Sequence, residues 1–137
     1  MNRLKLIDMK KILTAIPAPW PAVVVLLAVL YLTLSPMPLP PQFLPTFFGW
    51  DKVAHFVMFG GLAAVVVFDV RRMTTARLRP AVAVAIIVAI IALGGAIELL
   101  QGTSLINRYC DFPDFIANSL GAIVGGTVAY KLVNRYF

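Results

Sequence analysis

The sequence predicts an all-α membrane protein, a bundle of four transmembrane helices. Hydrophobic residues make up 61% of the 137 residues and charged residues only 13%, with a mean hydropathy of +0.90. Four long apolar runs are separated by short connections, and the stretch 81–97 lacks the apolar and polar alternation of membrane strands. A span needs about 20 residues to cross the ~30 Å hydrocarbon layer. We therefore expect one transmembrane domain over residues 1–137.

Apolar runs and prolines place the four spans. The first span follows the proline-rich segment 17–21 and stops at Ser35-Pro36, because proline is acceptable at a helix start and disruptive beyond the first turn. The other runs each come close to the length that a crossing requires. The predicted spans are about 19–35, 52–70, 80–101 and 113–133.

The residues before the first span allow two interpretations. A basic start before an apolar run is typical of a signal peptide, but no small-residue cleavage pattern follows Leu34, so we expect a retained helix. This pattern also favours a short basic helix lying on the inner leaflet. The alternative, a frayed tail whose lysines only fix the topology, stays open. The apolar residues at helical spacing are Leu6, Met9, Leu13 and Ile16.

Positive charge is concentrated on one side of the predicted spans. Ten of the twelve Lys and Arg residues lie before the first span, between the second and third, or after the fourth. Only Lys52 and Arg108 are left for the other side. The positive-inside rule then places both termini in the cytoplasm of a bacterium with the chain in its inner membrane. This distribution explains the net charge of +6 without a nucleic-acid partner.

The connection between the first two spans is rich in proline and aromatic residues. Five prolines lie between Pro36 and Pro45. Because aromatic side chains gather at membrane interfaces, we expect this loop to lie at the outer interface. Its aromatic residues are Phe43, Phe47, Phe48 and Trp50.

Polar side chains collect at the outer ends of the last three spans. Asp51 and His55 are four apart on the second span, and the polar residues of the other two spans are also three or four apart, so each helix presents one polar stripe. An ionisable residue at membrane depth costs about 2.5–3.5 kcal/mol, so such stripes face one another or a wet cavity. We expect one outward-facing pocket, formed by Asp51, Lys52, His55, Glu98, Gln101, Arg108, Asp111, Asp114 and Asn118.

Two further expectations concern the packing of the bundle. Small residues let apolar helices approach closely in lipid. The glycines expected at helix contacts are Gly60, Gly61, Gly94, Gly95, Gly121, Gly125 and Gly126. Separately, Asp69 is next to Arg71 and Arg72, and we expect it to be a solvated helix end.

Three blocks of sequence resemble the VanZ-like family, named for a protein associated with teicoplanin resistance. They are DKVAHFVMFG at 51–60, ELLQ at 98–101 and RYCDFPDFIANSLG at 108–121. The resemblance implies a small multi-helix membrane protein of the cell envelope, concerned with resistance to lipoglycopeptide antibiotics, and it implies no particular reaction. The family motif positions are Asp51, Lys52, His55, Glu98, Gln101, Arg108, Asp111, Asp114, Asn118 and Gly121.

The polar residues leave several functions open. The pocket could bind an envelope lipid or a lipoglycopeptide, or it could be an acid–base catalyst in which Asp51 or Asp114 orients His55. In that enzyme, Lys52 and Arg108 would bind the phosphate of a lipid-linked cell-wall precursor.

A metal and a purely structural role are the remaining hypotheses. Four acids against Lys52 and Arg108 leave an acidic surplus that could hold a divalent cation, with His55 suiting zinc and carboxylates suiting magnesium or calcium. No ligand spacing such as H-E-x-x-H supports this hypothesis. In the structural alternative, Arg108 pairs with Asp111 or Asp114 and the network only specifies helix packing.

Overall fold

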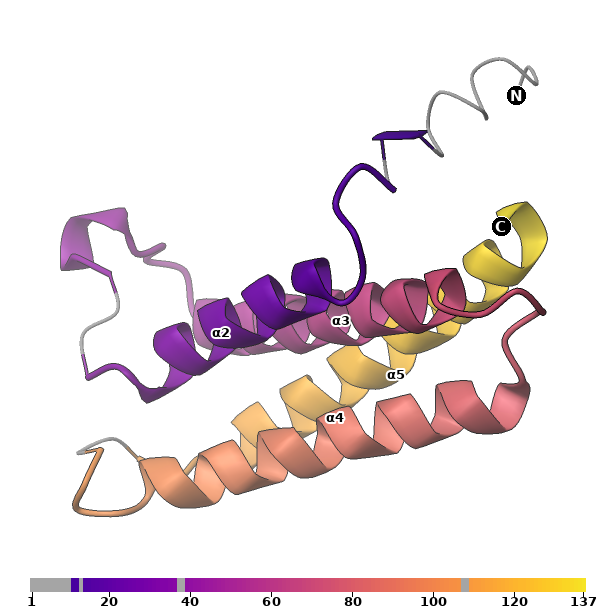
Figure 1. The fold of residues 1–137 in the computed structure, drawn as a ribbon. Helices are drawn as coiled ribbons and strands as arrows, with labels where there is room; N and C mark the ends of the chain where they lie inside the picture. Colours follow the sequence, from indigo (N-terminus) through magenta and orange to yellow (C-terminus); the bar gives the residue numbers. More distant parts are fainter. Residues whose placement is uncertain (1–10, 13, 37–38, 107–108) are drawn as a thin grey trace.

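The structure is a bundle of helices. The computed structural model describes residues 11–12, 14–36, 39–106 and 109–137, and this part of the chain contains no strand. Its elements are α2 (Trp20–Leu34), the short 3-10 helix η1 (Pro41–Phe43), α3 (Trp50–Arg72), α4 (Pro80–Gln101) and α5 (Phe112–Tyr136) (Figure 1). The predicted all-α class is confirmed. The N-terminal interfacial helix was expected from residues that lie mostly outside the described part.

Three of the helices are long and apolar enough to cross a membrane. These are α3, α4 and α5, with 23, 22 and 25 residues, whereas α2 is a shorter apolar helix of 15 residues. At 1.5 Å per residue, α2 is about 22 Å long and the other three are about 33 to 37 Å. All four helices begin and end within three residues of the predicted spans.

Proline and glycine define where the helices start. A proline occupies one of the first two positions of α2, α4 and α5, where the missing N–H costs no hydrogen bond. Helix α3 instead follows Gly49, whose φ of 79° is a left-handed conformation that favours glycine.

Helices α3 and α5 are in backbone contact through glycine. A Cβ on Gly121 would lie 2.2 Å from the carbonyl oxygen of Phe56, and a Cβ on Gly125 would lie 2.1 Å from that of Gly60. No larger residue fits there, so the predicted glycine packing is confirmed at this crossing. The expectation is wrong for Gly61, which is exposed and would have no heavy atom within 4 Å of a Cβ.

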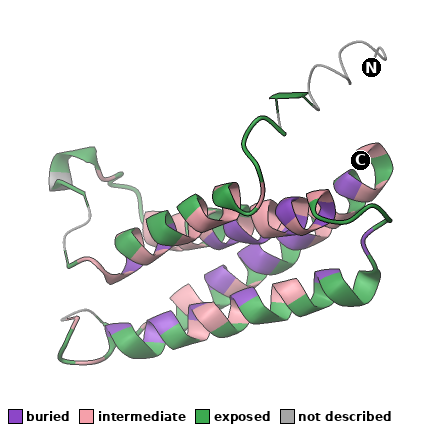
Figure 2. Cartoon of the chain, viewed as in Figure 1, coloured by how far each residue is buried: buried purple, intermediate pink, exposed green. Residues whose placement is uncertain are grey.

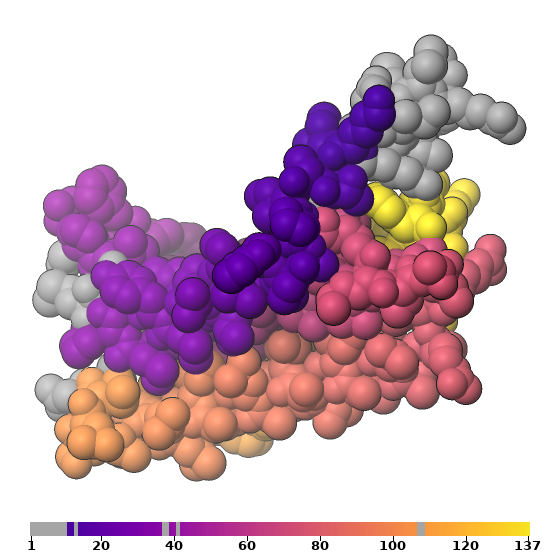
Figure 3. Space-filling view, viewed as in Figure 1, coloured from indigo at the N-terminus to yellow at the C-terminus, as the bar shows by residue number. Residues whose placement is uncertain are grey.

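The two ends of the bundle differ in character. The aromatic end contains the connections 35–49 and 102–111, and the arginine end contains the connection 73–79 and the C-terminus (Figure 1). Figure 2 shows both connections of the aromatic end as largely exposed, and Figure 3 shows their described parts, one purple and one orange, at the same end of the molecule. Exposed apolar side chains at this end are Leu39, Phe43, Phe47, Phe48, Leu105 and Tyr109.

Asp69 at the arginine end is buried. The expectation of a solvated helix end is wrong, since Asp69 is only 2% exposed. Its Oδ2 accepts the backbone N–H of Ala22 at 2.9 Å, and its Oδ1 pairs with Arg72. The first turn of a helix has N–H groups without partners inside the helix, and a carboxylate there is also favoured by the helix dipole. Asp69 therefore fixes the start of α2 against α3.

Candidate functional site

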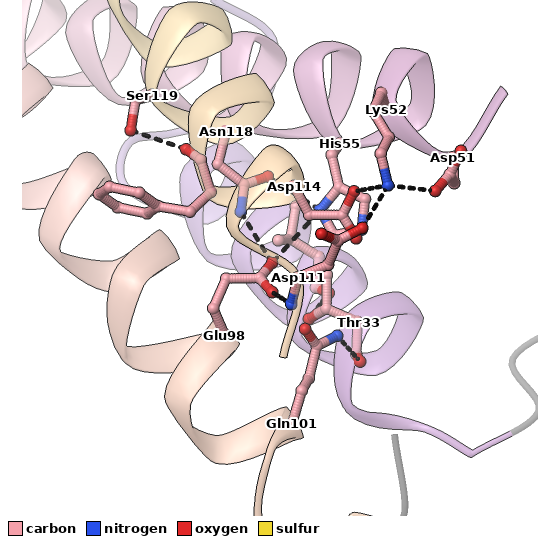
Figure 4. Close-up of polar contacts among 12 residues, drawn as sticks. Thr33, Asp51, Lys52, His55, Glu98, Gln101, Asp111, Asp114, Asn118 and Ser119 are labelled. Atoms are coloured by element: carbon pink, nitrogen blue, oxygen red, sulfur yellow. Dashed lines mark hydrogen bonds and ion pairs between the residues drawn. The ribbon is translucent and has the colours of Figure 1, made fainter. Parts of the chain in front are cut away.

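The polar side chains of three helices meet at the aromatic end. Most of the residues predicted for the pocket lie together (Figure 4). They come from helices α3, α4 and α5 and from Asp111, which directly precedes α5. Arg108 lies outside the described residues. We call the following residues the polar cluster: Asp51, Lys52, His55, Glu98, Asp111, Asp114 and Asn118.

The outer layer of the polar cluster is built around the ammonium group of Lys52. Its Nζ lies 2.7 Å from Asp51 Oδ2, 2.6 Å from Asp111 Oδ2 and 2.7 Å from Asp114 Oδ1. The side chains of Lys52, Asp51 and Asp111 are 35%, 44% and 40% exposed. Hydrogen bonds to Asp51 and Asp111 use two of the three N–H donors of this ammonium group, and Asp114 adds an ion pair. This geometry opposes the hypothesis that Lys52 binds a phosphate.

The inner layer of the polar cluster is buried beneath Lys52. The side chains of His55, Glu98 and Asp114 are 12%, 4% and 14% exposed, and Asn118 is fully buried. Asn118 Nδ2 donates to Glu98 Oε1 at 3.3 Å, and Asn118 Oδ1 lies 2.9 Å from His55 Nδ1. The other ring nitrogen, Nε2, lies 3.6 Å from Asp114 Oδ2. Asp114 links the layers, because its two oxygens face Lys52 and His55.

The backbone leaves room for Asn118 where α5 meets α4. A Cβ on Gly94 would lie 3.2 Å from the Cβ of Asn118 and 3.2 Å from the ring of Phe59. Glycine at this position therefore lets the amide reach the centre of the bundle. Glu98, one turn later on α4, also accepts the backbone N–H of Asp111 at 3.3 Å, which ties the start of α5 to the same carboxylate.

The comparison with protein families covers nearly all of this structure. The model of the VanZ/LLP1 family matches residues 13–134, which include all four helices up to the last turn of α5. The chain belongs to the VanZ/LLP1 family. No match was found among curated proteins or among solved structures. The resemblance seen in the sequence is thus confirmed, and it extends to α2.

In this VanZ/LLP1 chain, Gln101 lies beside the polar cluster and bonds to α2. Its Nε2 donates to the carbonyl oxygen of Thr33 at 2.7 Å, and both residues are buried. Thr33 is near the end of α2, where carbonyl groups have no partner inside the helix. The structure therefore places Gln101 at a contact between helices (Figure 4). Sequence reasoning missed Thr33, because a threonine in an apolar run usually bonds to its own helix, as its hydroxyl does here to Val29.

The polar cluster of this VanZ/LLP1 chain has a surplus of negative charge. Among the described residues it contains four carboxylates and one lysine, with His55 counted as neutral. Two groups have donor atoms within 4.8 Å of one another, as a metal site needs: His55, Glu98 and Asp114 form one, and Asp51, Asp111 and Asp114 form the other. Lys52 contacts every member of the second group, so the first group is the better candidate for a cation.

Proposed function

We propose that this VanZ/LLP1 protein binds an amphiphilic molecule of the bacterial cell envelope at the polar cluster. The ligand is an envelope lipid or a lipoglycopeptide antibiotic, and its capture contributes to resistance. The observation that carries the proposal is the position of the half-exposed outer layer at the same end as the exposed aromatic side chains. A polar group and an apolar chain of one molecule can contact these two surfaces together.

The proposal places the aromatic end on the extracytoplasmic side of the inner membrane. Ten of the twelve cations lie on the opposite side of the predicted spans, which supports cytoplasmic termini. Among the described residues of the arginine end and of the segment before α2, five basic side chains are exposed, as anchors in a cytoplasmic interface would be: Lys11, Arg77, Arg79, Lys131 and Arg135.

The polar group of the ligand contacts the outer layer. Asp51 and Asp111 are both about two-fifths exposed and present carboxylate oxygens beside Lys52. Their charge favours a headgroup with amine or hydroxyl donors. The apolar chain of the ligand lies against exposed residues of the loop such as Phe47 and Phe48, which are suited to the membrane interface.

Susceptibility of a Gram-positive host tests the proposal. Expression of the wild-type chain should raise the inhibitory concentration of a lipoglycopeptide and leave that of a glycopeptide without an acyl chain unchanged. The double variant Asp111→Asn, Phe48→Ser should lose this protection at an equal membrane level. Lys131→Gln, at the arginine end, serves as the matched control. Full protection by the double variant would refute binding at this surface.

An enzyme is the second candidate function. The contact between His55 Nε2 and Asp114 Oδ2 favours it, because a carboxylate beside an imidazole is a common acid–base pair. The substrate would be a lipid-linked phosphate, and the reaction a hydrolysis or a transfer. His55→Asn and Asp114→Asn would then abolish protection while folding and membrane level stay intact. If both variants protect fully, the enzyme hypothesis fails, the binding proposal stands, and His55 and Asp114 serve only the packing of the helices.

A further inference from the structure

We propose that the inner layer of the polar cluster binds one divalent transition-metal ion through His55 Nε2 and the carboxylates of Glu98 and Asp114. The inference deepens the proposed function and rests on it for its biological meaning, since the ion would lie directly beneath the surface that receives the ligand. Its physical argument comes from the inner layer alone.

The hydrogen bonds of Asn118 indicate which nitrogen of the His55 imidazole ring carries a proton. Asn118 Nδ2 donates to Glu98, so its Oδ1 is the atom that faces His55 Nδ1 at 2.9 Å and must accept a hydrogen bond there. Nδ1 therefore carries a proton, and in the neutral form of the ring Nε2 keeps a lone pair that can bind an ion. Metal-binding histidines show this arrangement, in which one nitrogen donates to an oxygen of the protein and the other binds the ion.

The distances between the donor atoms suit a small ion. His55 Nε2 lies 3.6 Å from Asp114 Oδ2, Glu98 Oε1 lies 3.9 Å from the other ring nitrogen, and one donor atom from each of the three residues lies within 4.8 Å of the others. Two ligand atoms that are each ~2.1 Å from a tetrahedral zinc ion are about 3.4 Å apart. The three ligands come from α3, α4 and α5, so the ion would join the three long helices.

Glu98 supplies an independent argument for a cation. Its side chain is 4% exposed, yet Lys52 does not reach it, and its described partners are the amide of Asn118, the backbone N–H of Asp111 and the ring of His55. Buried carboxylates are normally paired with a cation or coordinate a metal.

The donor set indicates which ions to expect. Imidazole suits zinc and other first-row transition metals, whereas magnesium and calcium prefer sites made of oxygen alone. One imidazole nitrogen with two carboxylates should therefore select Zn²⁺ or Co²⁺ over Ca²⁺ and Mg²⁺.

Metal titration of the purified full chain in detergent tests the inference. After removal of metal with a chelator, Zn²⁺ binding is measured by calorimetry and Co²⁺ binding by visible absorption, which reports a nitrogen ligand. We expect one ion per chain. His55→Asn retains a donor near the Nδ1 position and loses Nε2, so it should weaken Zn²⁺ binding by at least about 10- to 100-fold. Glu98→Gln and Asp114→Asn should act similarly, while Asp51→Asn should retain the wild-type affinity.

Several outcomes would overturn the proposal. They are no stoichiometric binding, equal affinity for Zn²⁺ and Ca²⁺, or a loss in Asp51→Asn as large as in His55→Asn. A further contrary result would come from nitrogen NMR of His55. If both ring nitrogens are protonated in excess Zn²⁺, Nε2 carries a proton and does not bind the ion. Thermal unfolding without metal identifies variants that fail to fold, and these would not count. Because no lipid or antibiotic is present, a negative result with intact resistance would refute the metal alone and leave the proposed function standing.

Discussion

Gly125 of α5 and Gly60 of α3 touch through their backbones, so that a Cβ on Gly125 would lie 2.1 Å from the carbonyl oxygen of Gly60. Of all the helix pairs, α3 and α5 make the most extensive contact. In lipid, apolar side chains gain nothing by moving from the lipid tails to a neighbouring helix. Close packing is therefore a main source of association between helices. The α3–α5 pair is thus the fixed frame on which His55, Asp114 and Asn118 are held.

Gly125→Ala should therefore destabilise the bundle. The added methyl group has to displace backbone, and overpacking of this kind costs about 1–3 kcal/mol. Thermal unfolding in detergent measures the loss. Gly61→Ala is the matched control on α3, since open space surrounds that position and alanine favours a helix. Equal melting temperatures for the two variants would contradict the close crossing.

Asp69→Asn should weaken the attachment of α2 at the arginine end. The amide oxygen can still accept the Ala22 N–H, but Arg72 loses its carboxylate partner in a buried setting, at a cost of about 3 kcal/mol or more. The expected result is a lower melting temperature, together with faster proteolysis near residues 14–19. Arg135→Gln, which removes an exposed charge at the same end, should have little effect. A variant as stable as the wild type would show that the pair contributes no net stability.

Gln101→Leu should loosen the other end of α2. The change leaves the buried carbonyl of Thr33 without the amide donor, which costs about 1–3 kcal/mol. Hydrogen exchange of the peptide 29–36 should accelerate, while exchange in α3 stays slow. Leu99→Ala, at an exposed neighbouring position on α4, provides the comparison. If both variants accelerate exchange equally, the bond between Gln101 and Thr33 is unimportant.

Reporter fusions test the orientation. Alkaline phosphatase fused after Thr103 should be active, because the connection 102–111 is expected outside the inner membrane, whereas fusion after Thr75 should be inactive. Fluorescent protein at Phe137 should fluoresce, as it does in the cytoplasm. The reverse pattern would place the polar cluster on the cytoplasmic side and remove the basis for an envelope ligand.

The helices could be predicted from the sequence because the apolar runs begin and end near prolines and other helix-breaking residues. The prolines Pro21, Pro80 and Pro113 mark the starts of three helices, and the long apolar runs give the extent of all four. The role of Asp69 could not be predicted in this way. An acid beside Arg71 and Arg72 is also typical of a solvated helix end. The carboxylate caps α2 only because Ala22, which is distant in the sequence, lies next to it.

The membership of the polar cluster was largely predictable, and its internal division was not. Spacing along each helix places Asp51 and His55 on one face, but it does not reveal that Lys52 bridges carboxylates from two helices. Gln101 occupies a position in the same stripe, yet it turns to Thr33 because α2 ends beside it. Partners on other helices determine these roles, and a single stripe contains no information about them.

Helix α2 is too short to match the other three. Its 15 residues cover about 22 Å, against a hydrocarbon layer of ~30 Å. Asp69 satisfies an N–H at its start and Gln101 a carbonyl near its end, so neither of these two groups depends on water. In a crossing by α2, as the sequence predicts, the bordering lipids would meet a lower apolar wall than those at α4, and the bilayer would have to thin to match it. A local thinning on one side of the protein would shorten the path by which an amphiphile in the membrane reaches the polar cluster.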